Sequence, residues 1–221
     1  MAKIQLVYFQ SNGVCQLLCC VHSIAFAGRG ESIRTLMVDN NVEYEEIDVG
    51  PFDDWVKEWK PKMAFGQCPY LKDGDVEIVQ SNAILRYLAR KLDLYGSNNK
   101  EATRADMIND GVEDLRTEYT RMIYQNYEKG KDPFIEDLPG KLQHFENLMK
   151  SGDYVLGSKI CFTDYNLFDL LNCLVTLSSP CLDKFPNLKA YRDRMMNRPG
   201  IQRRRATEHF KGLKINFNGK Q

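Results

Sequence analysis

Apolar and polar residues alternate differently in the two halves of this chain. In the first half, four short runs rich in β-branched and aromatic residues are predicted to be strands: Ile4–Phe9, Tyr44–Val49, Pro69–Lys72 and Val76–Val79. Apolar residues three and four positions apart predict amphipathic helices over Gly28–Asn40 and Gln80–Leu92, and Gly50–Ala64 is expected to be irregular. The order βαβ followed by ββα is that of a thioredoxin-like domain, an α/β fold with helices on both faces of a mixed sheet.

The second half of the chain reads as helices only. The polar run Gly96–Lys100 resembles a linker. Two long apolar stripes at helical spacing follow it: Ile108, Val112, Leu115, Tyr119 and Met122, then Phe134, Leu138, Leu142, Phe145 and Leu148. Tyr165–Leu177 is apolar nearly all round, so we expect it to be a buried central helix, and Leu188–Met196 a further helix. We therefore predict a thioredoxin-like domain over residues 1–96 and an all-helical domain over 97–221.

Composition excludes several classes of function. The 221 residues carry a formal net charge of zero, which does not suggest a nucleic-acid partner. No apolar run is long enough to span a bilayer, and the N-terminal residues lack the pattern of a signal peptide. The seven cysteines are odd in number and irregularly spaced, which disfavours a disulfide framework and fits a reducing compartment. We expect a cytoplasmic protein with no membrane or nucleic-acid partner.

The stretch from Phe65 to Leu92 carries the first candidate chemistry. It predicts a strand, a hairpin turn at Gly74, a return strand and a helix. If the Cys68–Pro69 bond is cis, the backbone beside it offers its N–H and C=O groups to an extended ligand. Gln80–Ser81 opens the helix, where free N–H groups and the helix dipole favour a carboxylate. The alternative is an ordinary hairpin followed by an ordinary helix cap.

A family resemblance changes the balance between these alternatives. Residues 66–96 resemble the glutathione-binding half of the soluble glutathione S-transferases. The match continues through INDGVEDLR (108–116), IYQNYEKGKD (123–132), LPGKLQHFENLM (138–149) and FTDYNLFDLL (162–171), which look like the pi class. The resemblance implies conjugation of reduced glutathione to hydrophobic electrophiles by a homodimer. It implies no cofactor, since glutathione is a co-substrate.

The chemistry of glutathione requires a group that stabilises a sulfur anion. A free thiol with a pKa of about 8.5 is mostly protonated at neutral pH, and the thiolate is the nucleophile. Lowering that pKa by about 2 units takes roughly 2.7 kcal/mol, which a hydrogen bond from a neutral hydroxyl helps to supply. The resemblance implies that the catalytic hydroxyl is that of Tyr8, in VYF, and that Arg29, in GRGESIR, lies near the thiolate.

The resemblance also implies the remaining contacts. Gln67 and the backbone of Cys68, beside Pro69, would bind the cysteinyl part, although the family commonly has leucine in place of Cys68. Gln80 and Ser81 would hold the γ-glutamyl carboxylate. The other implied contacts are Asp114 reaching the γ-glutamyl ammonium across a dimer interface, Trp55 and Lys60 on the glycyl carboxylate, and Phe9 and Tyr124 in the electrophile pocket. The loop joining Trp55 to Lys60 differs in length from the family pattern.

Two further positions carry structural expectations. Phe65 falls where the pi class has an aromatic key that inserts into the partner subunit, with Met107 and Ile108 lining the pocket; the alternative is a Phe65 folded onto its own core. Cys161 stands where the family has the Ser/Thr of a capping box that ends at Asp164. Cysteine is a poor cap, so we expect a loss of about 1 kcal/mol in the stability of the second domain.

The chain departs from the family between its first strand and first helix. The family pattern YFxxxGR has three residues there, whereas residues 10–27 here number eighteen, fifteen more. The added stretch is apolar from Leu17 onward, and pyrimidine-rich codons ending in TTT GCA GGN would encode much of it. We hypothesise a retained intron fragment or a misplaced exon boundary, which sequencing of the messenger RNA would test.

The long connection leaves two structures open. In the favoured one, Ile4–Phe9 stays the strand and Tyr8 keeps its place. In the other, Leu17–Ile24 replaces that strand and Ser23 takes the position of Tyr8. The spacing of Cys15, Cys19, Cys20 and His22 does not fit zinc patterns, so we predict no metal site. The insertion is also the feature that favours a rival function: a glutathione-transferase-like protein that binds glutathione or apolar ligands, or serves a structural or signalling role, without catalysis.

Overall fold

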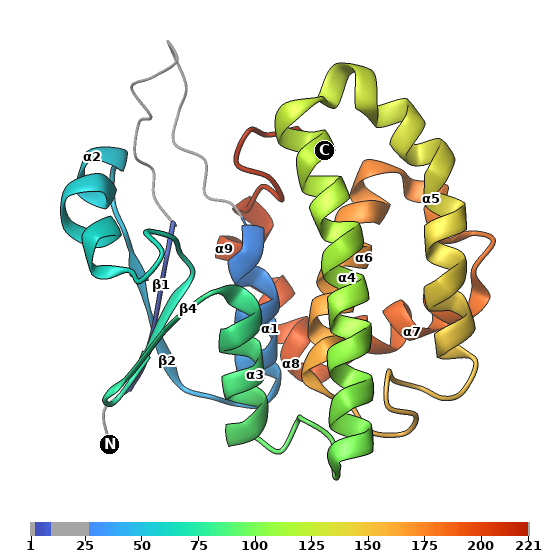
Figure 1. Ribbon diagram of the computed structural model, residues 1–221, viewed down its shortest axis with the longest axis horizontal. Helices are drawn as coiled ribbons and strands as arrows, with labels where there is room; N and C mark the ends of the chain where they lie inside the picture. The colour runs from blue at the N-terminus through green and yellow to red at the C-terminus, as the bar shows by residue number, and fades with distance from the viewer. Residues whose placement is uncertain (1–2, 10–26, 221) are drawn as a thin grey trace. The chain divides into compact units, whose positions relative to one another are not determined.

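The computed structural model describes residues 3–9 and 27–220, which divide into two compact units (Figure 1). One unit holds the described chain up to Tyr87 together with Arg203–Gly219, and the other holds Leu88–Gln202 together with Lys220. The division falls inside one helix, α3. The C-terminal segment therefore returns to the unit that contains the N-terminal strand.

The first unit is built on a four-stranded mixed sheet in the order β2-β1-β3-β4. The strands are β1 (Ile4–Tyr8), β2 (Tyr44–Asp48), β3 (Tyr70–Asp73) and β4 (Val76–Val79). β1 pairs parallel with β2 and antiparallel with β3. A parallel pair needs a crossover connection, and α1 (Glu31–Asp39) provides it. The thioredoxin-like α/β prediction is confirmed.

The position of β1 decides between the two structures left open by the long connection. Ile4–Tyr8 lies between β2 and β3, and Leu6, Val7 and Tyr8 are buried. Because this central place in the sheet is filled by Ile4–Tyr8, the replacement of that strand by Leu17–Ile24 is wrong. Leu17–Ile24 and Ser23 themselves lie outside the described residues, as do Cys15, Cys19, Cys20 and His22.

The segment expected to be irregular contains short helical turns. These are α2 (Phe52–Asp54), the π-helical η2 (Trp55–Trp59) and the 3₁₀ turn η3 (Lys60–Lys62). Trp55 and Met63 turn inward and pack with Val7, Val49 and Val79. Burial of these two side chains stabilises the turns. Pro61 does not prevent them, because it falls in the first turn of η3, where its missing N–H is tolerated.

The second unit is helical, as predicted. Its elements are α4 (Asn99–Gln125), α5 (Tyr127–Met149), α6 (Phe162–Leu177), η4 (Ser179–Leu182) and α7 (Pro186–Met196). α3 (Ser81–Lys91) and α8 (Pro199–Ala206) run from one unit to the other, and α9 (Glu208–Gly212) belongs to the first. α6 is buried along almost its whole length, and the hydroxyl of its Thr163 donates to the carbonyl of Ala105 in α4 at 2.9 Å.

The start of α6 has a capping box formed by Cys161 and Asp164. The Asp164 carboxylate accepts the backbone N–H groups of Cys161 at 2.8 Å and Val155 at 2.9 Å. Tyr191 donates its hydroxyl to the carbonyl of Asp164 at 2.7 Å. Burial raises the pKa of Asp164 to about 6, against the opposing effect of these N–H groups. The expected cost of cysteine at the cap stays a prediction.

Candidate functional site

Tyr8 lies at the end of β1 and accepts a hydrogen bond from the first turn that follows it. Its side chain is only 4% exposed, and its hydroxyl oxygen accepts the backbone N–H of Arg29 at 3.0 Å. A phenol oxygen that accepts one hydrogen bond still carries a proton to donate. The N–H also fixes the orientation of the oxygen. This arrangement suits the stabilisation of an anion.

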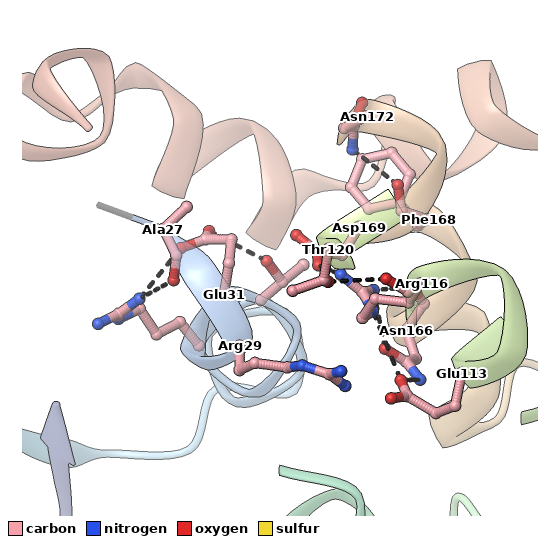
Figure 2. A network of polar contacts seen from close by, with 12 residues as sticks. Ala27, Arg29, Glu31, Glu113, Arg116, Thr120, Asn166, Phe168, Asp169 and Asn172 are labelled. Atoms are coloured by element: carbon pink, nitrogen blue, oxygen red, sulfur yellow. Dashed lines mark hydrogen bonds and ion pairs between the residues drawn. The ribbon is translucent and has the colours of Figure 1, made fainter. Parts of the chain in front are cut away.

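Arg29 belongs to a 3₁₀ turn, η1 (Gly28–Gly30), that leads into α1. Its backbone faces Tyr8, and Figure 2 shows its side chain extending away from Ala27 and Glu31. The side chain is partly exposed. The turn thus contributes a backbone donor to the phenol and a separate cationic group that solvent reaches.

The loop before β3 brings two glutamines together. The amide of Gln80 donates to the side-chain oxygen of Gln67 at 3.1 Å. Between them in the sequence, the Cys68–Pro69 peptide bond is cis, which meets the condition set from the sequence. Lys60 lies over the same loop, because a Cβ on Gly66 would stand 3.2 Å from the Lys60 Cε. Gly66 also has φ +59°, a left-handed conformation that favours glycine.

The junction between β4 and α3 is a single residue, Gln80. Its backbone has φ +74°, a left-handed conformation that costs a non-glycine residue about 1 kcal/mol or more and is concentrated at functional sites. Its carbonyl accepts the N–H of Ile84 at 3.0 Å, so Gln80 is the residue that caps α3. Ser81 therefore stands in the first turn, where unpaired N–H groups and the helix dipole attract a carboxylate.

The thiol of Cys68 is a poor nucleophile. The side chain packs against the apolar cluster of Val7, Trp55 and their neighbours, and burial raises its pKa to about 12. The group is therefore protonated at neutral pH. The candidate contact of Cys68 with a ligand is therefore through its backbone and not through its thiol.

The structure places the two candidates for a glycyl carboxylate differently. Trp55 is 7% exposed and belongs to the apolar cluster, with its ring 5.1 Å from that of Phe9. Lys60 is exposed. Lys60 thus presents a cation beside the Gly66–Cys68 backbone, while most of the Trp55 side chain is buried in the apolar cluster. Phe9, beyond the end of β1, packs on Trp55 and edge-on against Tyr8 at 6.2 Å.

The remaining candidates lie on surfaces of their own units. Asp114 is exposed on α4, and Tyr124, close to the end of the same helix, is 44% exposed. Phe65 is 69% exposed, so the alternative in which it folds onto its own core is wrong. Met107 is 58% exposed, as a pocket residue for a partner would be. Ile108 is 3% exposed, which corrects its assignment to that pocket, because it fills the core of the helical unit.

A buried charged cluster beneath Tyr8 was missed from the sequence. Arg34, which is 1% exposed, forms ion pairs with Glu46 and, at 3.5 Å, with Glu31. Arg204 donates two hydrogen bonds of 2.6 Å to the same Glu31 carboxylate. The three-residue spacing of Glu31 and Arg34 on a predicted helix is a signal that could have revealed one pair. No comparable spacing in the sequence identifies Glu46 or Arg204 as partners in this cluster.

The helical unit has a comparable cluster around Arg116. Arg116 pairs with Asp169 at 2.8 Å and donates to the carbonyl and side-chain oxygens of Asn166 at 2.9 and 3.0 Å, with Glu113 at 3.4 Å (Figure 2). These contacts tie α4 to α6. Among residues 3–9 and 27–220, no group of histidine, cysteine and acidic side chains could hold a metal ion. None of the described helices has the length and hydropathy of a membrane span.

Comparison with known proteins gives a consistent result. Residues 21–90 match the glutathione S-transferase N-terminal domain family, and residues 113–206 match the glutathione S-transferase C-terminal domain family. The chain is 48% identical to glutathione S-transferase P 1 of Bufo bufo over 199 residues, which cover 88% of this chain and 94% of the relative. It is 43% identical to glutathione S-transferase P of Homo sapiens with the same coverage.

A solved structure extends the similarity to the fold. The pi-class glutathione S-transferase of Onchocerca volvulus superposes with a TM-score of 0.88 at 40% identity, covering 100% of both chains. The agreement includes both units of the chain.

Proposed function

The chain belongs to the glutathione S-transferase family, and on that premise we propose that it conjugates reduced glutathione to hydrophobic electrophiles by stabilising the thiolate with the Tyr8 hydroxyl. The observation that supports this role most directly is the hydrogen bond from the Arg29 N–H to the Tyr8 oxygen at the end of β1. It orients the phenol, whose O–H donates to the sulfur when glutathione binds.

The tripeptide is gripped at its two ends by different groups. The γ-glutamyl carboxylate binds at the start of α3, where Ser81 and the backbone N–H groups of the first turn donate to it. The cysteinyl part pairs with the backbone of Cys68 beside the cis bond to Pro69 and with Gln67, whose side chain Gln80 holds in place. Lys60 neutralises the glycyl carboxylate, and Arg29 adds positive charge near the sulfur.

The protein works as a homodimer in the cytoplasm, without a cofactor. The exposed Phe65 inserts into a second copy next to Met107, because an aromatic side chain that is 69% exposed gains from burial in a partner. Asp114 of one copy reaches the γ-glutamyl ammonium held by the other. Phe9 contacts the electrophile.

One paired assay tests this function against a binding role without catalysis. The purified protein is passed over immobilised glutathione, and its conjugation of a chlorodinitrobenzene-type electrophile is followed in parallel. We expect both retention and turnover. Retention without turnover selects a glutathione-binding protein that lacks catalysis, and the absence of both contradicts a glutathione function altogether.

A further inference from the structure

The geometry points to Arg34 as a positioning residue for the reaction: we propose that its guanidinium holds both partners of the Tyr8–Arg29 hydrogen bond, so that the phenol meets the sulfur of glutathione despite the long connection that follows β1. This inference rests on the proposed function for its catalytic consequence. Its geometric part stands on contacts within the first unit alone.

Arg34 contacts the ring of Tyr8 from one side. Its guanidinium carbon lies 5.0 Å from the ring centroid, within the range of a cation over an aromatic face. Both side chains are buried, at 1% and 4% exposure, so neither moves without disturbing its neighbours. Gly30 closes the space beside them, because a Cβ there would stand 3.0 Å from Arg34 Nη1 and 3.3 Å from Tyr8 Cδ1.

Arg34 also holds the backbone that carries Arg29. Its Nη1 donates to the carbonyl of Ala27 at 3.0 Å. Two backbone bonds from the C-terminal segment fix the same point: the N–H of Ala27 donates to the carbonyl of Lys214 at 2.7 Å, and that of Gly28 to the carbonyl of Ile215 at 3.3 Å. Ala27 is thus held on both its N–H and its C=O, two residues before the N–H that reaches Tyr8.

Arg34 links two parts of the chain that are far apart in the sequence, since seventeen residues, 10–26, separate Phe9 from Ala27. Its Nη1 donates to the Ala27 carbonyl, and its guanidinium lies over the Tyr8 ring. One side chain therefore contacts both sides of the Tyr8–Arg29 hydrogen bond.

The orientation of Arg34 is itself determined by two carboxylates. Glu46, on the strand next to β1, pairs with its Nε, and Glu31 lies 3.5 Å from its Nη1. Glu31 is in turn held by Arg204. Because a guanidinium is planar and presents its N–H groups in fixed directions, fixing one nitrogen on Glu46 directs the others. A lysine at this position would carry the positive charge but would lack the planar, forked set of N–H donors.

Arg204 provides a matched control for Arg34. Both are buried arginines that pair with Glu31, but Arg204 contacts neither Tyr8 nor Ala27 in any described interaction. Arg34→Met and Arg204→Met each remove one buried cation from the same cluster, so both are expected to lower the melting temperature. Only Arg34→Met is expected to disturb the phenol.

Two measurements test the inference on the purified full-length protein. The first is amide hydrogen exchange at Arg29, which reads the bond to Tyr8 without glutathione. The second is the pKa of the glutathione thiol bound to the enzyme, read from thiolate absorbance against pH. For Arg34→Met we expect at least tenfold faster exchange at Arg29 and a thiol pKa about one unit higher, which lowers the thiolate fraction, and with it kcat, about threefold at pH 7.

The controls separate the possible failures. Arg204→Met should leave the Arg29 exchange rate and the bound thiol pKa at the wild-type values. Arg34→Lys should bring neither quantity fully back to the wild-type value. Unchanged exchange at Arg29 in Arg34→Met, or equal changes in Arg204→Met, would overturn the positioning role. A wild-type protein that does not ionise glutathione, yet loses Arg29 protection in Arg34→Met alone, would contradict the proposed function and leave the geometric role of Arg34 intact.

Discussion

The candidate site uses two strand-to-helix junctions that are built in opposite ways. From β4 to α3 the chain passes through one residue, Gln80, whose left-handed backbone turns the chain directly into the helix. From β1 to η1 it passes through residues 9–27, and the far end is held by Arg34, Lys214 and Ile215. We call the β1–η1 connection the first junction and the β4–α3 connection the second junction. The second junction is determined by its own backbone, whereas the first is held by residues outside it.

This difference teaches where each junction is vulnerable. A locally determined junction is changed only by substitutions within it, whereas a junction held by distant contacts depends on every group in the cluster. The two junctions also have different tasks in the proposed reaction. The β1–η1 junction stabilises the sulfur anion, and the β4–α3 junction binds the γ-glutamyl end. Substitutions at each should therefore separate turnover from affinity.

The largest effect is expected at the first junction, from Tyr8→Phe. Removing the hydroxyl removes the hydrogen bond to sulfur, so the thiol pKa returns toward its free value and kcat/KM near neutral pH falls about 100-fold for a loss of about 2 pKa units. Retention on immobilised glutathione should persist. A Tyr8→Phe enzyme with wild-type turnover would show that the catalytic hydroxyl lies elsewhere.

At the second junction, Ser81→Ala should affect binding instead. A hydrogen bond to a charged group contributes about 1.5 to 3 kcal/mol, so KM for glutathione should rise about tenfold or more. The pKa of the bound thiol should stay at the wild-type value, which titration of thiolate absorbance would check. If Ser81→Ala shifted the thiol pKa as Tyr8→Phe does, the proposed division of tasks between the junctions would be wrong.

A smaller effect is expected from Gly30→Ala, which adds a methyl group between Arg34 and the Tyr8 ring. Overpacking of this kind costs about 1 to 3 kcal/mol of unfolding free energy, and we expect conjugation to slow a few-fold. Urea unfolding and initial rates measure the two effects. Gly111→Ala in α4 is the control, since its Cβ would meet nothing within 4 Å and it should stabilise the protein by about 0.5 to 1 kcal/mol.

The smallest effect is expected outside both junctions, at the start of α6. Burial raises the pKa of Asp164 from 3.8 to about 6, so the folded state favours the protonated carboxyl. Its contribution to stability is complete below the unfolded pKa and is lost as pH rises through about 6. Between pH 5 and pH 7 we expect a loss of about 1 kcal/mol.

Urea unfolding of the wild type and of Asp164→Asn at the two pH values would measure this loss. The variant has no ionisable group at this position, so its stability should change less over the same interval. An identical pH dependence in the two proteins would assign the change to other carboxyl groups.

The fold and the second junction were predictable from the sequence because their signals are local. Strand and helix periodicity gave the sheet and the buried α6, and the positions of Cys68–Pro69 before a strand and of Gln80–Ser81 at the start of a helix suggested a ligand site. The left-handed backbone of Gln80 was not predicted, since a glutamine carries no sign of positive φ.

The first junction was predictable only in part. Tyr8 was assigned correctly to the end of a strand, but nothing near it in the sequence indicates Arg34, Glu46 or Arg204 as its support. Ile108 was assigned both to an apolar helical stripe and to a partner's pocket, and its burial agrees with the stripe. The turns at Phe52–Lys62 depend on burying Trp55 and Met63, which is a tertiary effect.

The two carbonyls that receive Ala27 and Gly28 belong to Lys214 and Ile215, almost two hundred residues later in the sequence. During translation, β1 emerges from the ribosome long before these partners exist. Even if the nascent chain pairs its strands early, the turn beside Tyr8 cannot take its final form until residue 215 has been synthesised and released from the exit tunnel. A premature stop codon upstream of that point would therefore damage the beginning of the molecule as well as its end.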